Sequence, residues 1–301
     1  MQLSKIKSWK LCVFAPFSNW REIYLQSITK ILKVSMSLEL NLVGKTAIVT
    51  GGSAGIGLAT AKALYSEGVN VAIAARNPER LEQAVFDIQS LPTTGAKVIE
   101  ISADLTKAED VEKVVSTTLE QFSKVDILIN NAGSARAGSF LELSDEAFLD
   151  AWNLKLLGYI RLVKTVIPYF KNQKDGRIVN IIGGAGRTPR PNFLPGGTTN
   201  AALLNFTRGI SKELALDNIR INAISPGLTD TERAKTLAVQ NAQSLGISVE
   251  EYQAQAVKSI PLGKIVHPEE IASLALFLVS DLAASITGAE IQVDGGSTPG
   301  V

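Results

Sequence analysis

Short runs of apolar residues alternate with longer stretches of helical periodicity from Lys45 almost to the end of the chain. Several runs are apolar at every position, which is typical of strands covered on both faces. The predicted strands are Lys45–Thr50, Asn70–Ala75, Lys97–Ser102, Val125–Asn130, Arg177–Ile182, Ile219–Ser225 and Glu290–Val293. The predicted helices include Ile56–Glu67, Pro78–Gln89, Lys107–Phe122, Ser144–Phe170, Thr198–Leu216 and Pro268–Ser280.

This alternation predicts right-handed strand–helix–strand crossovers and an open parallel sheet with helices on both faces. No linker-like stretch interrupts residues 40–301. We therefore expect a single α/β domain over residues 39–301, doubly wound and Rossmann-like.

The first 38 residues differ from the rest and are expected to be an extension outside the folded domain. Within residues 1–35, six lysines and arginines accompany a single acid, Glu22. Two interpretations stay open. One is an organelle-targeting or membrane-surface helix, whose apolar face would consist of Ile23, Ile28, Ile31 and Leu32. The other is an appendage without function, or an upstream start with Met36 as the real initiator.

Composition narrows the class of protein. The 301 residues carry a net charge of +1, so nothing global points to a nucleic-acid or acidic partner. The apolar share of 46% is ample for a core. The single cysteine, Cys12, cannot form an intrachain disulfide, which suits a reducing compartment, and we predict a cytoplasmic protein. No run approaches the roughly 18 apolar residues of a membrane span.

A glycine-rich turn, Thr50-Gly51-Gly52-Ser53-Ala54-Gly55-Ile56-Gly57, joins the first predicted strand to the first helix. Gly51 permits a tight turn, Gly55 lets the backbone approach a ligand, and Gly57 lets helix and strand pack closely. Free N–H groups at the helix start then face an anion. In this context the turn predicts dinucleotide binding. The alternative is an ordinary turn whose glycines serve only packing.

The end of the second predicted strand bears on which dinucleotide binds. An acid there would bond the ribose 2′-hydroxyl of NAD. The strand instead ends in Ala74-Ala75-Arg76. Because the planar guanidinium of Arg76 suits phosphate oxygens, we favour NADP over NAD. Alternatively, Arg76 only begins the next helix.

From about Leu42 to Gly296 the chain resembles the short-chain dehydrogenase/reductases. Asp104, followed by Leu105, stands where that family's aspartate contacts the adenine. Asn130-Asn131-Ala132-Gly133 matches the family's Asn-Asn-Ala-Gly, and Pro226-Gly227 matches the loop that approaches the nicotinamide. The resemblance implies a nicotinamide cofactor, a small-molecule substrate and a homodimer or homotetramer built on the long helices. The predicted cofactor-binding residues are Gly51, Ser53, Ala54, Gly55, Ile56, Gly57, Arg76, Asp104, Leu105, Asn131, Ala132, Gly133, Pro226 and Gly227.

The resemblance breaks at the residues that carry the family's chemistry. That chemistry uses a tyrosine as acid/base, a lysine beside it, a serine that polarises the carbonyl and an asparagine in a proton relay. Judged by their flanking residues, the matching positions are Gly196 for Tyr, Asn200 for Lys, Gly183 for Ser and Lys155 for Asn. No catalytic role is carried over to them. Five glycines are expected to enlarge the space beside the nicotinamide: Gly183, Gly184, Gly186, Gly196 and Gly197.

Lys155 and Tyr159 are candidate replacements for the proton donor, because they lie one helical turn apart. A desolvated lysine can have a lowered pKa and act as acid/base. The alternative is a surface lysine and a packing tyrosine. Arg187 and Arg190 could bind a substrate carboxylate or phosphate, or simply face solvent. We expect no metal site, since His267 is the single histidine.

Three functional hypotheses follow. The favoured one is an NADP(H)-dependent oxidoreductase that transfers hydride to or from a carbonyl or alcohol substrate with an atypical proton donor. The second is a non-catalytic nucleotide-binding protein, either a scaffold or a redox sensor. The third is an enzyme of another class in which the cofactor is structural.

Overall fold

The computed structural model describes residues 39–299. The predictions for the 38-residue extension, its targeting helix, the start at Met36 and Cys12 concern residues outside that range.

Seven parallel strands form one sheet in the order β3-β2-β1-β4-β5-β6-β7. The strands coincide with the predicted ones apart from their ends, and the predicted doubly wound α/β fold is confirmed. Their bounds are β1 Thr46–Thr50, β2 Asn70–Ala75, β3 Val98–Ser102, β4 Ile127–Asn130, β5 Gly176–Ile181, β6 Ile219–Pro226 and β7 Glu290–Val293.

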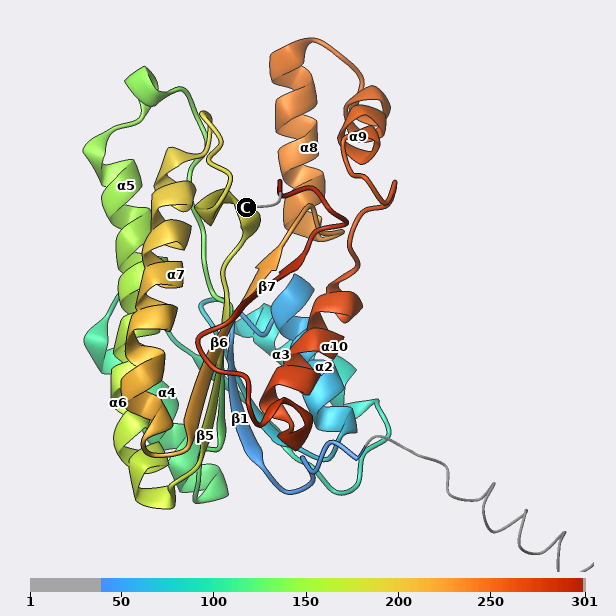
Figure 1. Ribbon diagram of the computed structural model, residues 1–301. Coiled ribbons are helices and arrows are strands. Elements are labelled where there is room, and N and C mark those ends of the chain that lie inside the picture. Colours follow the sequence, from blue (N-terminus) through green and yellow to red (C-terminus); the bar gives the residue numbers. More distant parts are fainter. Residues whose placement is uncertain (1–38, 300–301) are drawn as a thin grey trace, which may run out of the picture. The chain divides into compact units, whose positions relative to one another are not determined.

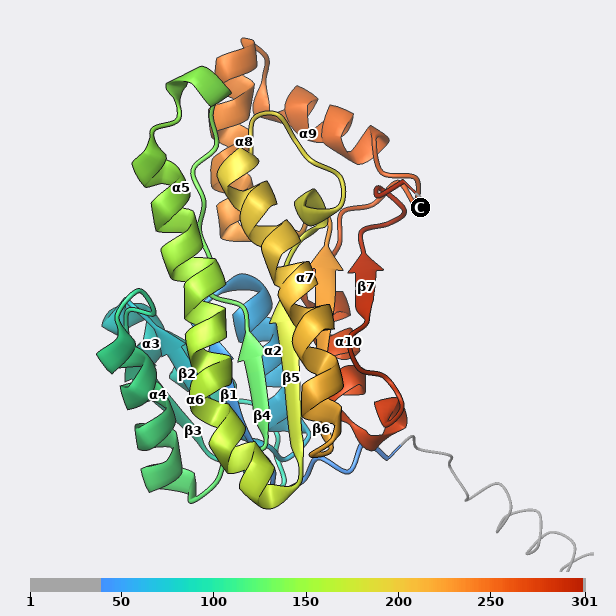
Figure 2. The same cartoon turned by 60° about the vertical axis from the view of Figure 1, so that its left-hand side comes forward.

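Helices cover both faces of this sheet (Figures 1 and 2). Residues of α2, α3 and α10 form one hydrophobic cluster with the strands, and residues of α4, α6 and α7 form a second cluster on the opposite face. The bounds of these helices are α2 Gly55–Ser66, α3 Pro78–Gln89, α4 Ala108–Phe122, α6 Gly158–Gln173, α7 Leu194–Ala215 and α10 Pro268–Val279. Within residues 39–299 no helix is both long and apolar enough to cross a membrane.

The continuous apolar runs are explained by these two clusters. In β1, Ala47 and Val49 pack with α2 and α10, whereas Ile48 points to the other side and packs with α4 and α6. Successive side chains of a strand point to opposite faces, so a strand covered on both sides needs an apolar residue at every position.

The structure differs from the predicted helices in three places. The stretch predicted as one helix is α5 (Asp145–Ala151), a π-helical segment (Trp152–Leu157) and α6. Helix α7 begins at Leu194, four residues before the predicted start at Thr198. The prediction missed its first turn because that turn is rich in Gly and Pro, which are poor helix formers. Helices α8 (Glu232–Leu245) and α9 (Val249–Lys258) were not predicted; they bury few apolar side chains, so little of their sequence is strongly apolar.

The strand order places the carboxyl ends of β1 and β4 side by side, although the chain visits β2 and β3 between them. Such a switch point opens a crevice at the carboxyl edge of the sheet, where loops from both halves meet. The glycine-rich turn after β1 lies at this edge. A Cβ on Gly57 would collide with the carbonyl oxygen of Gly51 and with Asn131 Nδ2.

We expect Gly57→Ala to lower the free energy of unfolding by about 1–3 kcal/mol, because the colliding oxygen belongs to the backbone and cannot move aside. Gly209→Ala is the matched control. It lies in α7 with nothing within 4 Å of an added Cβ. There the substitution should stabilise by about 0.5–1 kcal/mol. Urea unfolding followed by circular dichroism measures both, and equal effects would contradict this account.

Candidate active site

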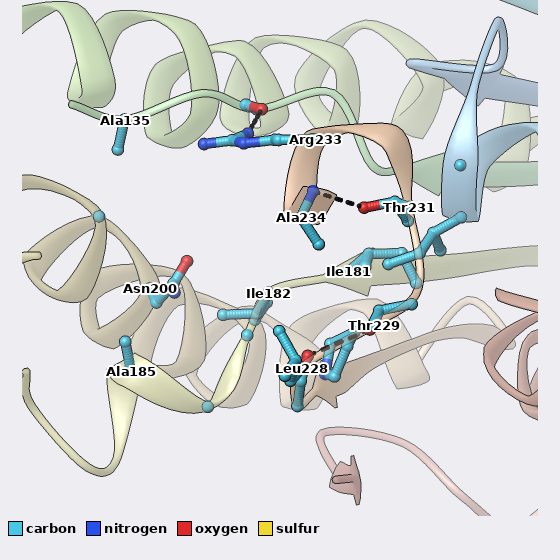
Figure 3. A pocket seen from close by; sticks show the side chains of 18 of the residues that line it. Ala135, Ile181, Ile182, Ala185, Asn200, Leu228, Thr229, Thr231, Arg233 and Ala234 are labelled. Carbon is cyan, nitrogen blue, oxygen red and sulfur yellow. Dashed lines mark hydrogen bonds between the residues drawn. The ribbon is translucent and has the colours of Figure 1, made fainter. Parts of the chain in front are cut away.

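A cleft of about 670 Å³ opens at the carboxyl edge of the sheet (Figure 3). Its walls are the glycine-rich turn after β1, the loops after β4 and β5, the start of α7, the loop from β6 into α8, and the loop after β7. Nine of the predicted cofactor-binding residues line it: Gly51, Ala54, Gly55, Ile56, Asn131, Ala132, Gly133, Pro226 and Gly227.

Hydrogen bonds between Thr50 and Asn131 fix two of these walls to each other. The Thr50 hydroxyl accepts the backbone N–H groups of Asn131 and Ala132 at 2.9 and 3.1 Å. The Asn131 amide donates to the carbonyl oxygens of Thr50 and Gly51 at 3.0 and 3.3 Å. We call these four bonds the Thr50–Asn131 clamp. The clamp holds the loop after β4 against the glycine-rich turn.

The turn itself has the conformation that a phosphate-binding turn requires. Gly51 and Gly55 have φ of +63° and +53°, a region that residues with a side chain rarely adopt. Helix α2 has no side-chain cap at Ala54 and no acid in its first turn. Its first N–H groups therefore face the cleft without an internal acceptor, which fits an anionic group such as a pyrophosphate.

The other predicted cofactor residues lie outside the lining of the cleft. Ser53 is half-buried in the turn, and Gly57 packs beneath Gly51. The Leu105 side chain is buried in the α4–α6 cluster, so it contributes packing rather than a cleft surface. Arg76 is exposed at the end of β2. Burial opposes ionisation of the neighbouring Asp104, yet hydrogen bonds from Thr106 and the charge of Arg76 hold its pKa below the usual value.

Lys155 enters the cleft from the π-helical segment, a distortion frequently found at functional sites. Its amine donates to the carbonyl oxygen of Ile182 and, at 2.9 Å, to Asn200 Oδ1. Burial, together with the positive charge of Arg233, lowers the pKa of Lys155 to about 7. The structure therefore excludes the alternative of a surface lysine.

Tyr159 does not join Lys155 in the cleft, and the expectation that it could donate a proton was wrong. Its side chain is fully buried among Ile182, Leu203 and Ala223. The hydroxyl donates to the carbonyl oxygen of Ile181 at 3.0 Å, and burial raises its pKa well above the usual value. The alternative of a packing tyrosine is confirmed.

The glycines after β5 widen the cleft less than expected. Gly183, with φ of +124°, and Gly184 do line it. A Cβ on Gly186, however, would come within 2.9 Å of the Asn200 carbonyl carbon, so this glycine allows α7 to pack closely. At Gly196 an added Cβ would collide with the ring of Phe193. Phe193 thus fills the space that a side chain at position 196 would occupy.

Residues 39–299 contain no group of three or more His, Cys, Asp or Glu side chains able to hold a metal ion. His267 lies at the N-cap of α10, where its backbone N–H donates to Glu270 Oε2 at 2.9 Å. Its observed position is that of a helix cap.

Comparisons with known proteins agree with this geometry. Residues 51–298 match the family described as enoyl-(acyl carrier protein) reductase. The chain is 34% identical over 255 residues to 3-oxoacyl-[acyl-carrier-protein] reductase of Chlamydia trachomatis, covering 85% of this chain and 98% of the relative. The chain belongs to the short-chain dehydrogenase/reductase family.

Solved structures of family members superpose closely. L-sorbose reductase of Gluconobacter frateurii, crystallised with NADPH and L-sorbose, gives a TM-score of 0.82 at 30% identity, over 87% of this chain and all of that one. NAD⁺-bound xylitol dehydrogenase gives 0.80 at 29% identity, over 85% of this chain and all of that one. As a short-chain dehydrogenase/reductase, the protein is an NAD(P)-dependent oxidoreductase acting on a carbonyl or alcohol group. The predicted family and enzyme class are confirmed.

Two cleft residues escaped the sequence analysis. Arg233 lies in α8, which was not predicted, and donates to the carbonyl oxygen of Gly133 at 2.7 Å (Figure 3). Its position six residues after Gly227, which belongs to the motif matched to the nicotinamide-approaching loop, was the available signal. Phe193 precedes Gly196 by three residues, a spacing that brings side chains together on a helix. That signal was hidden because α7 was expected to begin later.

We expect Gly196→Ala to lower the free energy of unfolding by about 1–3 kcal/mol, because the Phe193 ring must leave its site. In a Phe193→Ala background the same substitution should cost far less, giving a coupling of at least about 1 kcal/mol. Urea unfolding of the two single variants and the double variant measures this coupling. Additive effects would show that the ring does not fill the site.

Proposed function

We propose that the protein is an NADP(H)-dependent oxidoreductase in which Lys155 exchanges the proton with the substrate oxygen. The observation that carries this proposal is the placement of the Lys155 amine inside the cleft, bonded to Ile182 and Asn200. The positions matched to the family's Tyr and Ser are Gly196 and Gly183, which have no side chain to offer.

The Lys155–Asn200 contact supports a specific replacement of the family's catalytic residues. The sequence match puts the family's Asn at position 155 and its Lys at position 200, and this chain has the reverse. The two side chains touch at 2.9 Å, so the amine and the amide are both retained, with their chain positions exchanged. Asn200 then acts as a positioning residue, because its carbonyl oxygen holds the amine of Lys155.

The chemistry of an ammonium group fits the role of proton donor. When bound, the reduced cofactor supplies a hydride, and the protein must supply a proton to the substrate oxygen. Lys155 has three N–H donors in its charged form, and two of them go to Ile182 and Asn200. The third is available to a carbonyl oxygen in the cleft. A pKa of about 7 suits both release and recapture of that proton near neutral pH.

The predicted cofactor residues fall into three proposed contacts. The glycine-rich turn would hold the pyrophosphate, Asp104 and the backbone at Leu105 would border the adenine, and Pro226-Gly227 would border the nicotinamide. Arg76 would hold the 2′-phosphate of NADP. Its exposed position beside Asp104 and the absence of an acid at the end of β2 support this choice.

A homodimer or homotetramer is the proposed assembly. The outward face of α5 and the π-helical segment exposes Leu149, Trp152 and Leu157, at 57%, 37% and 41% of their surfaces. Apolar side chains gathered on one face favour an interface between subunits. Light scattering that gave the mass of one chain would contradict it.

Reduction by the wild-type enzyme should depend on pH through Lys155. Since the ammonium form predominates below its pKa of about 7, kcat/KM for ketone reduction should be level below pH 7 and fall about tenfold per pH unit above it. Lys155→Met should lower kcat/KM by about 10²- to 10⁴-fold and remove this pH dependence. NADPH oxidation with a panel of ketones and aldehydes measures both.

Lys164→Met is the matched control, because Lys164 is exposed on α6, away from the cleft. It should behave as wild type. If Lys155→Met keeps the wild-type rate and pH profile, Lys155 is not the proton donor.

Arg76→Met is expected to raise the dissociation constant of NADPH by about 10- to 100-fold, since one charge-assisted phosphate contact is lost. The dissociation constant of NADH, which lacks the 2′-phosphate, is the internal control and should change less than about threefold. Fluorescence titration measures both constants. An equal loss for the two cofactors, or no loss for either, would argue against a 2′-phosphate site at Arg76.

A further inference from the structure

Two basic side chains, Arg233 and Lys155, both contact or lie against Gly133, at the end of the cleft where the substrate would react. The Arg233 guanidinium donates to the Gly133 carbonyl oxygen at 2.7 Å. The stem of Lys155 lies against the same residue, since a Cβ on Gly133 would come within 2.8 Å of Lys155 Cδ. Figure 3 shows Arg233 extending from α8 into the cleft, with Asn200, the partner of Lys155, on the facing wall.

No carboxylate balances this pair. Among the ion pairs of the part of the chain that the structure describes, none includes Lys155 or Arg233. Two acids do line the cleft, but both have other partners. Asp294 accepts the N–H groups of Gly296 and Thr298 at 2.9 and 2.8 Å. Glu232 pairs with Lys235 at 3.0 Å.

The two arginines singled out in the sequence are less suited to hold an anion. Arg187 is committed to the buried carboxylate of Glu290, so the expectation that it could bind a substrate was wrong. Arg190 and Arg233 are both exposed residues of the cleft lining, but Arg233 bonds to Gly133, the residue against which the Lys155 stem lies. Arg233 is therefore the guanidinium placed to act together with Lys155.

Two neighbouring like charges that lack a counter-charge repel each other, and a bound anion offsets that repulsion. A guanidinium has five N–H donors in a planar fork that matches a carboxylate, and Gly133 occupies one of them. The glycine-rich turn already offers the N–H groups at the start of α2 to a pyrophosphate. Lys155 lies instead beside Ile182 and Asn200, where the substrate would react, and Arg233 bonds to Gly133 next to the Lys155 stem.

We propose that Arg233, together with Lys155, selects carbonyl substrates that carry a carboxylate, so that the enzyme reduces oxo acids and oxidises hydroxy acids. This inference rests on the proposed function, since it names the substrate class of the same site. In the reduction, Lys155 would give one proton from its ammonium to the carbonyl oxygen, while the carbonyl carbon would take the hydride that a bound reduced cofactor supplies. The carboxylate remains bound to Arg233 throughout.

The test compares three acids of increasing spacing, namely pyruvate, acetoacetate and levulinate, with their neutral methyl esters. For at least one pair the wild type should show a kcat/KM at least tenfold higher for the acid. Arg233→Met, which keeps an unbranched apolar stem but removes the guanidinium, should bring that acid-to-ester ratio close to one, mainly through KM for the acid. Arg233→Lys should retain part of the preference. Lys235→Met is the matched control on the same helix, outside the cleft lining, and should keep the wild-type ratio.

Two further measurements separate this inference from the function on which it rests. NADPH titration of Arg233→Met shows whether the guanidinium serves the cofactor: a rise in the dissociation constant of NADPH with an unchanged acid-to-ester ratio would overturn the inference. Calorimetric binding of acetoacetate to the NADP⁺ complex needs no turnover. If no carbonyl compound is reduced but acetoacetate binds in an Arg233-dependent way, the proposed function fails and carboxylate recognition stands. If carbonyl compounds are reduced with no preference for the acid over its ester, the proposed function stands and carboxylate recognition fails.

Discussion

The Thr50–Asn131 clamp is the contact on which the geometry of the cleft depends. It joins the end of β1 to the end of β4, two strands that are neighbours in the sheet but far apart in sequence. Gly57 makes the clamp possible, since any side chain there would displace the Asn131 amide. The clamp fixes the separation of the cleft walls at this edge, so the loops on either side can vary without loss of the nucleotide site.

At the end of the cleft that holds Lys155, the local packing and backbone conformation leave little room for side chains at positions 183 and 196. Phe193 lies over Gly196, and Gly183 adopts a φ that disfavours a side chain. A tyrosine at 196 or a serine at 183 would therefore not fit this backbone without local rearrangement. What the site does offer is an amine, placed by the π-helical segment and held by Asn200. The proposed proton donor is thus consistent with the packing around it.

Charge connects the proposed chemistry to the proposed substrate. Burial and the nearby Arg233 both disfavour the charged form of Lys155 and bring its pKa to about 7. A bound carboxylate would act in the opposite direction, because an anion close to the amine favours the ammonium. Substrate binding would then load the proton that the reduction consumes. Recognition and proton transfer would depend on the same pair of cations.

The sequence by itself determined the fold, the nucleotide-binding edge and the family. Apolar runs and glycine spacing are local properties, and a parallel sheet covered on both faces leaves few arrangements of them. The sequence also located Lys155, but it could not show that Lys155 faces the cleft and Tyr159 the core. In a regular α-helix residues four apart share a face, whereas the π-helical segment that contains Lys155 changes the direction of its side chain relative to Tyr159. Only the tertiary structure decided that Phe193 fills the space above Gly196, that Arg187 is bound to Glu290, and that Arg233 bonds to Gly133 next to the Lys155 stem. The last two are contacts between segments distant in the chain, and their distances are set by how helices pack on the sheet rather than by any local pattern. The first is local, but it depends on where α7 begins.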